Sequence, residues 1–169
     1  MTTVLPIPHR ANAELVAGAY LRTVLADYAT AVGAVLQGPD RDTGTVTWGS
    51  TGFIQLTAIS GTLDINVPVR HTVVSIDVWA ATAQGRSKKP PWNVAYAIAE
   101  AVIATQFDTT SHDTHRVVSL PTGYPDARVL EFSALTEPSR RPSDPADYAR
   151  VGMDVRFAWH GLGTTWTTP

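Results

Sequence analysis

Residues 149–160 have a clean strand alternation, and this pattern strongly restricts how the chain can fold. Large apolar side chains alternate there with polar or small ones, and the apolar series is Val151, Met153, Val155, Phe157 and Trp159. Successive side chains of a strand point to opposite faces of a sheet, so the segment predicts a strand with one apolar and one polar face. We therefore expect a sheet whose apolar face is covered by other elements.

Shorter apolar runs between glycine, proline and polar residues predict the other strands of this sheet. Residues 69–81 have the strongest signal, because every second side chain from Val74 to Ala80 is apolar. Neither side of residues 127–136 is strongly polar, which favours a central strand. Further short strands are expected at residues 31–36, 45–48, 53–59 and 117–120.

Residues 43–53 contain a dense turn signal. Two of the short β-like runs, at 45–48 and 53–59, are separated by a Gly-Ser-Thr-Gly segment at 49–52. This spacing predicts a β-hairpin with a polar, glycine-rich tip. We expect that hairpin to project from the body of the subunit.

Two segments have the apolar repeat of an amphipathic helix. The first covers residues 13–29, with Asn12 at the position of the N-cap. The second begins near Trp92, directly after Pro90 and Pro91, since proline suits the start of a helix. Both helices have an apolar stripe that can cover a sheet.

Together the predicted elements define an α+β fold. Its sheet is mixed and mostly antiparallel, two helices cover one face, and a β-hairpin projects from it. A chain of 169 residues is long enough for one compact domain with a hydrophobic core. We therefore expect a single domain over residues 1–169, which ends in an extended tail at residues 161–169.

Charge and cysteine content exclude several classes of function. The chain has 13 Lys and Arg against 15 Asp and Glu, so it lacks the basic excess that binding to a phosphate backbone usually needs. The absence of cysteine excludes disulfides, thiolate metal sites and a cysteine nucleophile. No apolar run approaches the roughly 20 residues of a membrane span. The N-terminus lacks the pattern of a signal peptide, so we expect a soluble protein without membrane association.

Few residues suggest catalysis. His112 and His115 have a spacing that could place two imidazoles near one metal, with Asp113 between them, but no third ligand is indicated. Asp144 and Asp147 could form a carboxylate pair, yet ion pairing with nearby arginines explains them equally well. We therefore expect no enzyme activity, no catalytic residue, no metal and no cofactor.

The proline-rich, charged segment at residues 137–147 predicts a stiff exposed loop rather than part of the sheet. Its mixed charges could pair with one another or contact another protein surface, where they would set orientation and add little net affinity. A basic cluster at 86–89 could contact phosphate or a neighbouring acidic surface, or form a solvated loop. Trp48 and Trp166, in turn-rich or terminal segments, are candidates for contacts between subunits. The candidate interface residues are Trp48, Arg86, Lys88, Lys89, Arg140, Arg141, Asp144, Asp147 and Trp166.

Four pieces of the chain follow one another in a characteristic order. They are a helix at residues 14–28, the strand from Val73 to Trp79, an alanine-rich helix at 92–104, and a closing strand at 148–159. This order resembles the tail terminator proteins of long-tailed (siphovirus-type) bacteriophages. The resemblance implies a small α/β subunit that forms a hexameric ring, caps the last ring of the tail tube and stops its polymerisation.

The same resemblance implies the partners and the location of the protein. Its partners would be further copies of itself, the tail tube protein and a head–tail connector or neck protein. Genomic DNA would pass through the lumen of the ring without specific binding, which the near-neutral charge permits. The protein would be assembled in the host cytoplasm and lie in the virion at the neck-proximal end of the tail. The alternatives are a connector, neck or tail-completion subunit and, third, a small metal-dependent hydrolase.

Overall fold

The computed structural model describes residues 11–28, 30–36, 45–63, 68–82, 89–107, 116–142 and 148–162. Within these residues lie two α-helices, α1 (Ala13–Val24) and α2 (Trp92–Ala104). The strands are β1 (Ala31–Gly33), β2 (Phe53–Leu63), β3 (Arg70–Ala80), β4 (Arg116–Val118), β5 (Ala127–Ala134), β6 (Ser139–Arg140) and β7 (Ala149–Gly161). The fold is therefore mixed α+β, as the sequence predicts.

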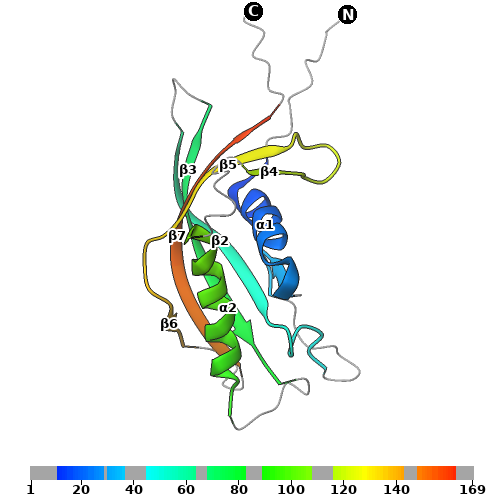
Figure 1. The fold of residues 1–169 in the computed structure, drawn as a ribbon, viewed down its shortest axis with the longest axis vertical. Coiled ribbons are helices and arrows are strands. Elements are labelled where there is room, and N and C mark those ends of the chain that lie inside the picture. Colours follow the sequence, from blue (N-terminus) through cyan, green and yellow to red (C-terminus); the bar gives the residue numbers. More distant parts are fainter. Residues whose placement is uncertain are drawn as a thin grey trace, which may run out of the picture.

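All the strands belong to one curled sheet with the order β1-β2-β3-β7-β5-β4, and β6 pairs with β7 beside this path (Figure 1). β1 runs parallel to β2, and the other pairs in the described residues are antiparallel. The long β7 lies between β3 and β5, so the alternating segment that dominates the sequence forms an inner strand.

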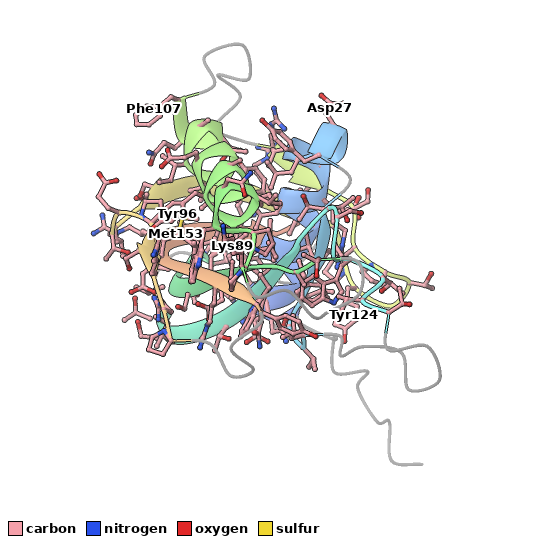
Figure 2. All side chains as sticks on the ribbon, turned by 90° about the horizontal axis from the view of Figure 1, so that it is seen from below. Asp27, Lys89, Tyr96, Phe107, Tyr124 and Met153 are labelled. Atoms are coloured by element: carbon pink, nitrogen blue, oxygen red, sulfur yellow. The ribbon has the colours of Figure 1, made fainter. Side chains whose placement is uncertain are left out.

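One side of the sheet carries the main core. Its central rows join Val74 with Val155, Ile76 with Met153, and Val78 with Val151 across β3 and β7; these side chains are buried in one cluster. Both helices contribute to the same cluster, which includes the buried side chains Val16, Leu21, Ile98 and Val102. Met153 of β7 belongs to this cluster and Tyr96 of α2 packs against it; both are labelled in Figure 2. Burial of each large aliphatic side chain contributes about 1.5–3 kcal/mol.

The helices begin where their sequence signals place them. The side chain of Asn12 accepts a hydrogen bond from the backbone N–H of Leu15 at 2.7 Å, which caps α1. The first helix is shorter than the predicted 13–29, because a separate 3₁₀ turn, η1 (Ala26–Tyr28), follows Leu25. α2 starts at Trp92 after the two prolines. Neither helix in the described residues is long and apolar enough to cross a membrane.

The predicted hairpin at residues 43–53 is wrong for its described part. Residues 45–48 form no strand; residues 47–51 form turns, and β2 begins at Phe53. Instead of projecting, this segment packs on the sheet, where it forms a second buried cluster of Val46, Trp48, Phe53, Trp79, Ala81 and Tyr148. The physical reason is that burial of the apolar surface of Val46 and Trp48 stabilises the fold, whereas a projecting tip would leave that surface in water.

Gly52 allows the turn before β2 to pass close to α2. Its φ of 77° lies in the left-handed region that glycine adopts without a steric penalty. A Cβ at this position would also overlap the side chain of Ile98. The glycine in the predicted hairpin tip therefore serves a close approach between the turn and α2.

The loop between β5 and β7 also differs from the prediction, since part of it joins the sheet. Ser139 and Arg140 form β6 and pair with Gly152 and Val151 of β7. Proline removes a backbone donor, but the two paired positions are not prolines. The prolines at 138 and 142 flank the short ladder and limit its length.

Candidate functional site

Two neighbouring arginines, Arg140 at the end of β6 and Arg141 directly after it, lie on opposite faces of the sheet. The guanidinium of Arg140 lies 4.6 Å from the ring centre of Trp92, at the start of α2. Arg141 lies on the other face, where its guanidinium approaches Asp77 and Asp154. This follows from strand geometry, because successive side chains point to opposite sides. Two residues that look equivalent in the sequence therefore have different surroundings.

The second face holds an ion-pair cluster of Asp77, Arg141, Arg150 and Asp154, hereafter the Asp77 cluster. Asp77 is only 7% exposed, and Nη2 of Arg150 donates a hydrogen bond to its Oδ2 at 2.7 Å. Nε of Arg141 lies 3.5 Å from Oδ1 of Asp77, and Nη2 of the same arginine lies 3.4 Å from Oδ1 of Asp154. Two cations therefore face two anions, and the buried carboxylate is compensated.

Arg150 links this cluster to the end of the loop and to an aromatic ring. Its Nη1 donates to the carbonyl of Pro142 at 3.3 Å, and the backbone N–H of Arg141 donates to the carbonyl of Arg150 at 2.9 Å. The guanidinium also lies 4.9 Å from the ring centre of Trp79, within the range of a cation–π contact. The cluster therefore fixes residues 141–142 against β7.

Gly152 provides the space through which Arg141 reaches Asp77. A Cβ on this glycine would overlap the Arg141 side chain at Nε, Cδ and Cζ. The backbone of Gly152 is an ordinary paired strand position, opposite both Asp77 and Ser139. The absence of a side chain, rather than an unusual φ, is what this site requires.

We expect Gly152→Ala to lower the free energy of unfolding by about 1–3 kcal/mol, as overpacking of a filled site does. The new methyl group would displace Arg141 from Asp77. Urea unfolding of the purified subunit measures the change. Gly161→Ala is the matched control, because a Cβ there meets its nearest neighbour at an ordinary 3.8 Å. Equal stability of both variants would contradict this account of Gly152.

The structure brings together few of the predicted interface residues. Arg140 and Lys89 are exposed, and Arg141 belongs to the Asp77 cluster. Trp48 is 2% exposed, so the structure places it inside the subunit, whereas we expected it at a contact between subunits. The others, Arg86, Lys88, Asp144, Asp147 and Trp166, lie outside the described residues.

The metal hypothesis falls largely outside the described part of the chain. His112, Asp113 and His115 are all in the segment 108–115, which the structure does not describe. Within the described ranges, no group of three or more His, Asp and Glu side chains is arranged to hold a metal ion.

Comparisons with known proteins give matches at the level of structure. No protein-family profile and no curated protein matches the sequence. Among solved structures, a chain from the virion of a native gene transfer agent (GTA) particle resembles this fold with a TM-score of 0.46 and 17% sequence identity. The match covers 89% of this chain and 100% of that chain. A likeness at this level assigns no role to the residues of the site.

Sequence reasoning missed three members of the Asp77 cluster as a set: Asp77, Arg150 and Asp154. One signal was present, because Asp77 stands between Ile76 and Val78 in a strand with one purely apolar face. A carboxylate in such a strand needs a cationic partner if it is buried. The sequence does not say which of the arginines provides it.

Proposed function

We propose that this protein is a structural, non-enzymatic subunit of a phage-type virion that forms a homo-hexameric ring on the end of the tail tube. The ring stops polymerisation of the tube and joins the tail to the head-side connector. DNA passes through its lumen without specific binding. The protein acts in the virion, at the neck-proximal end of the tail, after assembly in the host cytoplasm.

The observation that carries this proposal is the order of the four pieces on which the resemblance to tail terminators rests. In the structure these pieces are α1, β3, α2 and β7. All four contribute buried side chains to one core cluster. The pieces therefore form a single packed unit, as a tail-terminator subunit requires.

The arrangement of the core also favours both helices on one face of the sheet. The core side chains of β3 and β7 come from the same cross-strand rows, and cross-strand partners share a face. α1 and α2 both pack against that cluster. The opposite face carries the Asp77 cluster and, around Trp79, the second buried cluster, and its remaining surface is the proposed place of contact with other subunits.

The charged segments remain the proposed sites of contact between rings. Arg140 and Lys89 are exposed in the described residues. Arg86, Lys88, Asp144, Asp147 and Trp166 complete the proposed set. Mixed charges of this kind give orientation rather than strong affinity.

Deletion of the gene from its virus tests the tail-capping role. Without a cap, tube subunits continue to add, so we expect tails of irregular and increased length in electron micrographs of the lysate. Expression of the protein in trans should restore uniform tails. Purified protein should likewise bind the ends of tubes assembled from the tail tube protein.

A connector or neck subunit would behave differently in the same experiment. Tails of uniform length that fail to join heads would overturn the tail-capping role and favour that alternative. In that case the purified protein should bind portal-side proteins and leave the ends of tail tubes free.

A further inference from the structure

The four central strands of the sheet are β2, β3, β7 and β5. Their paired residues form rows that run across the sheet from the outer edge of β2 to the outer edge of β5. One row joins Ala58, Val74, Val155 and Ala134 across β2, β3, β7 and β5. The adjacent row, whose side chains lie on the opposite, polar face, joins Ser60, Val73, Arg156 and Ser133. Each row therefore begins on β2 and ends on β5.

Both ends of the first row are capped by side chains from outside the sheet. Oε1 of Glu14, on α1, accepts a hydrogen bond from the backbone N–H of Ala58 at 3.0 Å. Oε1 of Gln106 accepts one from the backbone N–H of Ala134 at 2.9 Å; it belongs to the 3₁₀ turn η2 (Thr105–Phe107). Each cap satisfies a donor that would otherwise face outward from a sheet edge.

Beyond these caps the edges are open in the part of the chain that the structure describes. β1 pairs only with Phe53–Gln55 of β2, and β4 pairs only with Ala127–Val129 of β5. No described strand pairs with the outer side of residues 56–63 or 130–134. Both edges therefore offer backbone donors and acceptors to a further strand.

Residues 57–62 of the β2 edge contain neither charged residues nor proline, two features that usually prevent pairing between chains, although the register with β3 shifts between Ala58 and Ser60, as in a β-bulge. Residues 57–62 are all exposed, including Ile59 at 56%. Their sequence, Thr-Ala-Ile-Ser-Gly-Thr, contains no charged residue and no proline. Natural sheet edges are normally protected by lysine, proline, a β-bulge or a covering element. An edge of this composition that no described strand covers beyond Gln55 is open to a partner strand.

We propose that the β2 edge of one copy pairs with the β5 edge of the next copy, so that the sheet continues from subunit to subunit. β2 and β5 run in opposite directions, because three antiparallel pairings separate them. A head-to-tail repeat therefore preserves the antiparallel alternation. Glu131 is the charged residue of the open β5 edge, and it would face an uncharged β2 edge, so no like charges meet.

Head-to-tail pairing of β2 with β5 is favoured over a twofold arrangement in which β2 pairs with β2. Pairing of β2 with β2 would satisfy one edge in each subunit and leave both β5 edges open. Head-to-tail pairing uses the open segments of both β2 and β5, and in a ring that closes every copy has both segments paired. This inference deepens the proposed ring and rests on it for closure, but the contact itself rests on the two open edges.

Cysteine cross-linking tests the contact directly, because the chain contains no cysteine. Ser60 and Ser133 end the same row, and within one chain three strand spacings of about 4.8 Å, or about 14 Å in all, separate them. This exceeds the distance of about 7 Å that a disulfide can span, so any bond must join two copies. Ser60→Cys and Ser133→Cys are small changes at serines.

We expect an equimolar mixture of the two single variants to give a disulfide-linked dimer under mild oxidation, at least tenfold more than either variant alone. A short bismaleimide should give the same product if the two edges are offset by a residue. The double variant should give a ladder that ends at the ring size. Ser75→Cys replaces Ser60→Cys in the control, because Ser75 lies on an inner strand and should give no dimer.

Three results would overturn the inference. The first is a disulfide-linked dimer of Ser60→Cys alone, which would indicate a twofold contact. The second is the absence of any cross-link in a sample that light scattering shows to be oligomeric. The third is a protein that stays monomeric at all concentrations. Failure of the tail-capping role is distinguishable from each. A ladder of cross-linked copies, together with tails of uniform length in the deletion virus, would support the edge contact and reject the capping role. Tails of irregular length without such a ladder would support the capping role and reject the edge contact.

Discussion

Asp77→Asn should lower the free energy of unfolding by about 3 kcal/mol, the lower end of the cost of breaking a buried ion pair. The amide keeps the shape of the side chain but leaves Arg150 and Arg141 without their shared anion. The cost stays at that lower end because the two arginine side chains are 29% and 34% exposed and can partly rehydrate. In urea, the midpoint should fall by about 1.5 M at a slope of about 2 kcal/mol/M.

Asp154→Asn is the matched control for this experiment. Its carboxylate has one ion pair, with Arg141 at 3.4 Å, and its side chain is 28% exposed. We expect a change of about 0.5 kcal/mol, as for other partly solvated pairs. If Asp77→Asn were as stable as Asp154→Asn, the burial of Asp77 would not determine the energy of the cluster.

The Asp77 cluster also changes how the loop should be tested for assembly. Substitution of Arg141 perturbs a buried carboxylate and therefore the subunit itself. Arg140 touches the ring of Trp92 and is exposed. A charge reversal intended to probe contacts between subunits should therefore be made at Arg140. A reversal at both positions would mix loss of assembly with loss of folding.

The elements predicted best from sequence are those with a long regular period. α2 begins at Trp92, as its prolines and apolar repeat predict. β3 and β7 match the predicted strands to within one residue at each end. In these segments the local pattern and the packing of the core favour the same structure, so the sequence is sufficient.

The missed features depend on contacts between distant residues. β6 has two residues and no periodicity. It forms because the backbone of Val151 and Gly152 in β7 can pair with a further strand. Asp77 and Arg150 are 73 residues apart in sequence. Their contact depends on the register between β3 and β7, which a one-residue slip would destroy. Such pairings cannot be deduced from composition or spacing.

Trp48 shows why a tryptophan in a glycine-rich segment is ambiguous. Its neighbours Gly49 and Ser50 indicate a turn, and the turn is present. The side chain nevertheless packs against the rings of Phe53 and Tyr148, at centroid distances of 5.9 and 5.6 Å. A tryptophan suited to an interface is equally suited to a core, because both sites bury a large apolar surface.

Trp48→Ala should therefore destabilise the subunit by about 3–5 kcal/mol, as loss of a buried tryptophan side chain does. The cavity would lie between the turn at 47–51 and the sheet, where Phe53, Trp79 and Tyr148 line the second cluster. Urea unfolding monitored by circular dichroism measures the change. The loss should not depend on protein concentration, because the contacts are within one chain.

Phe107→Ala is the control for this last variant, because it also removes an aromatic ring, but one that is 70% exposed and projects from η2 (Figure 2). We expect it to change stability by about 0.5 kcal/mol or less. An interface role for Trp48 requires the opposite pattern: Trp48→Ala would keep the unfolding midpoint of the isolated subunit and shift only the concentration at which copies associate. A buried ring in a second core predicts loss of the fold first, with any loss of assembly as its consequence.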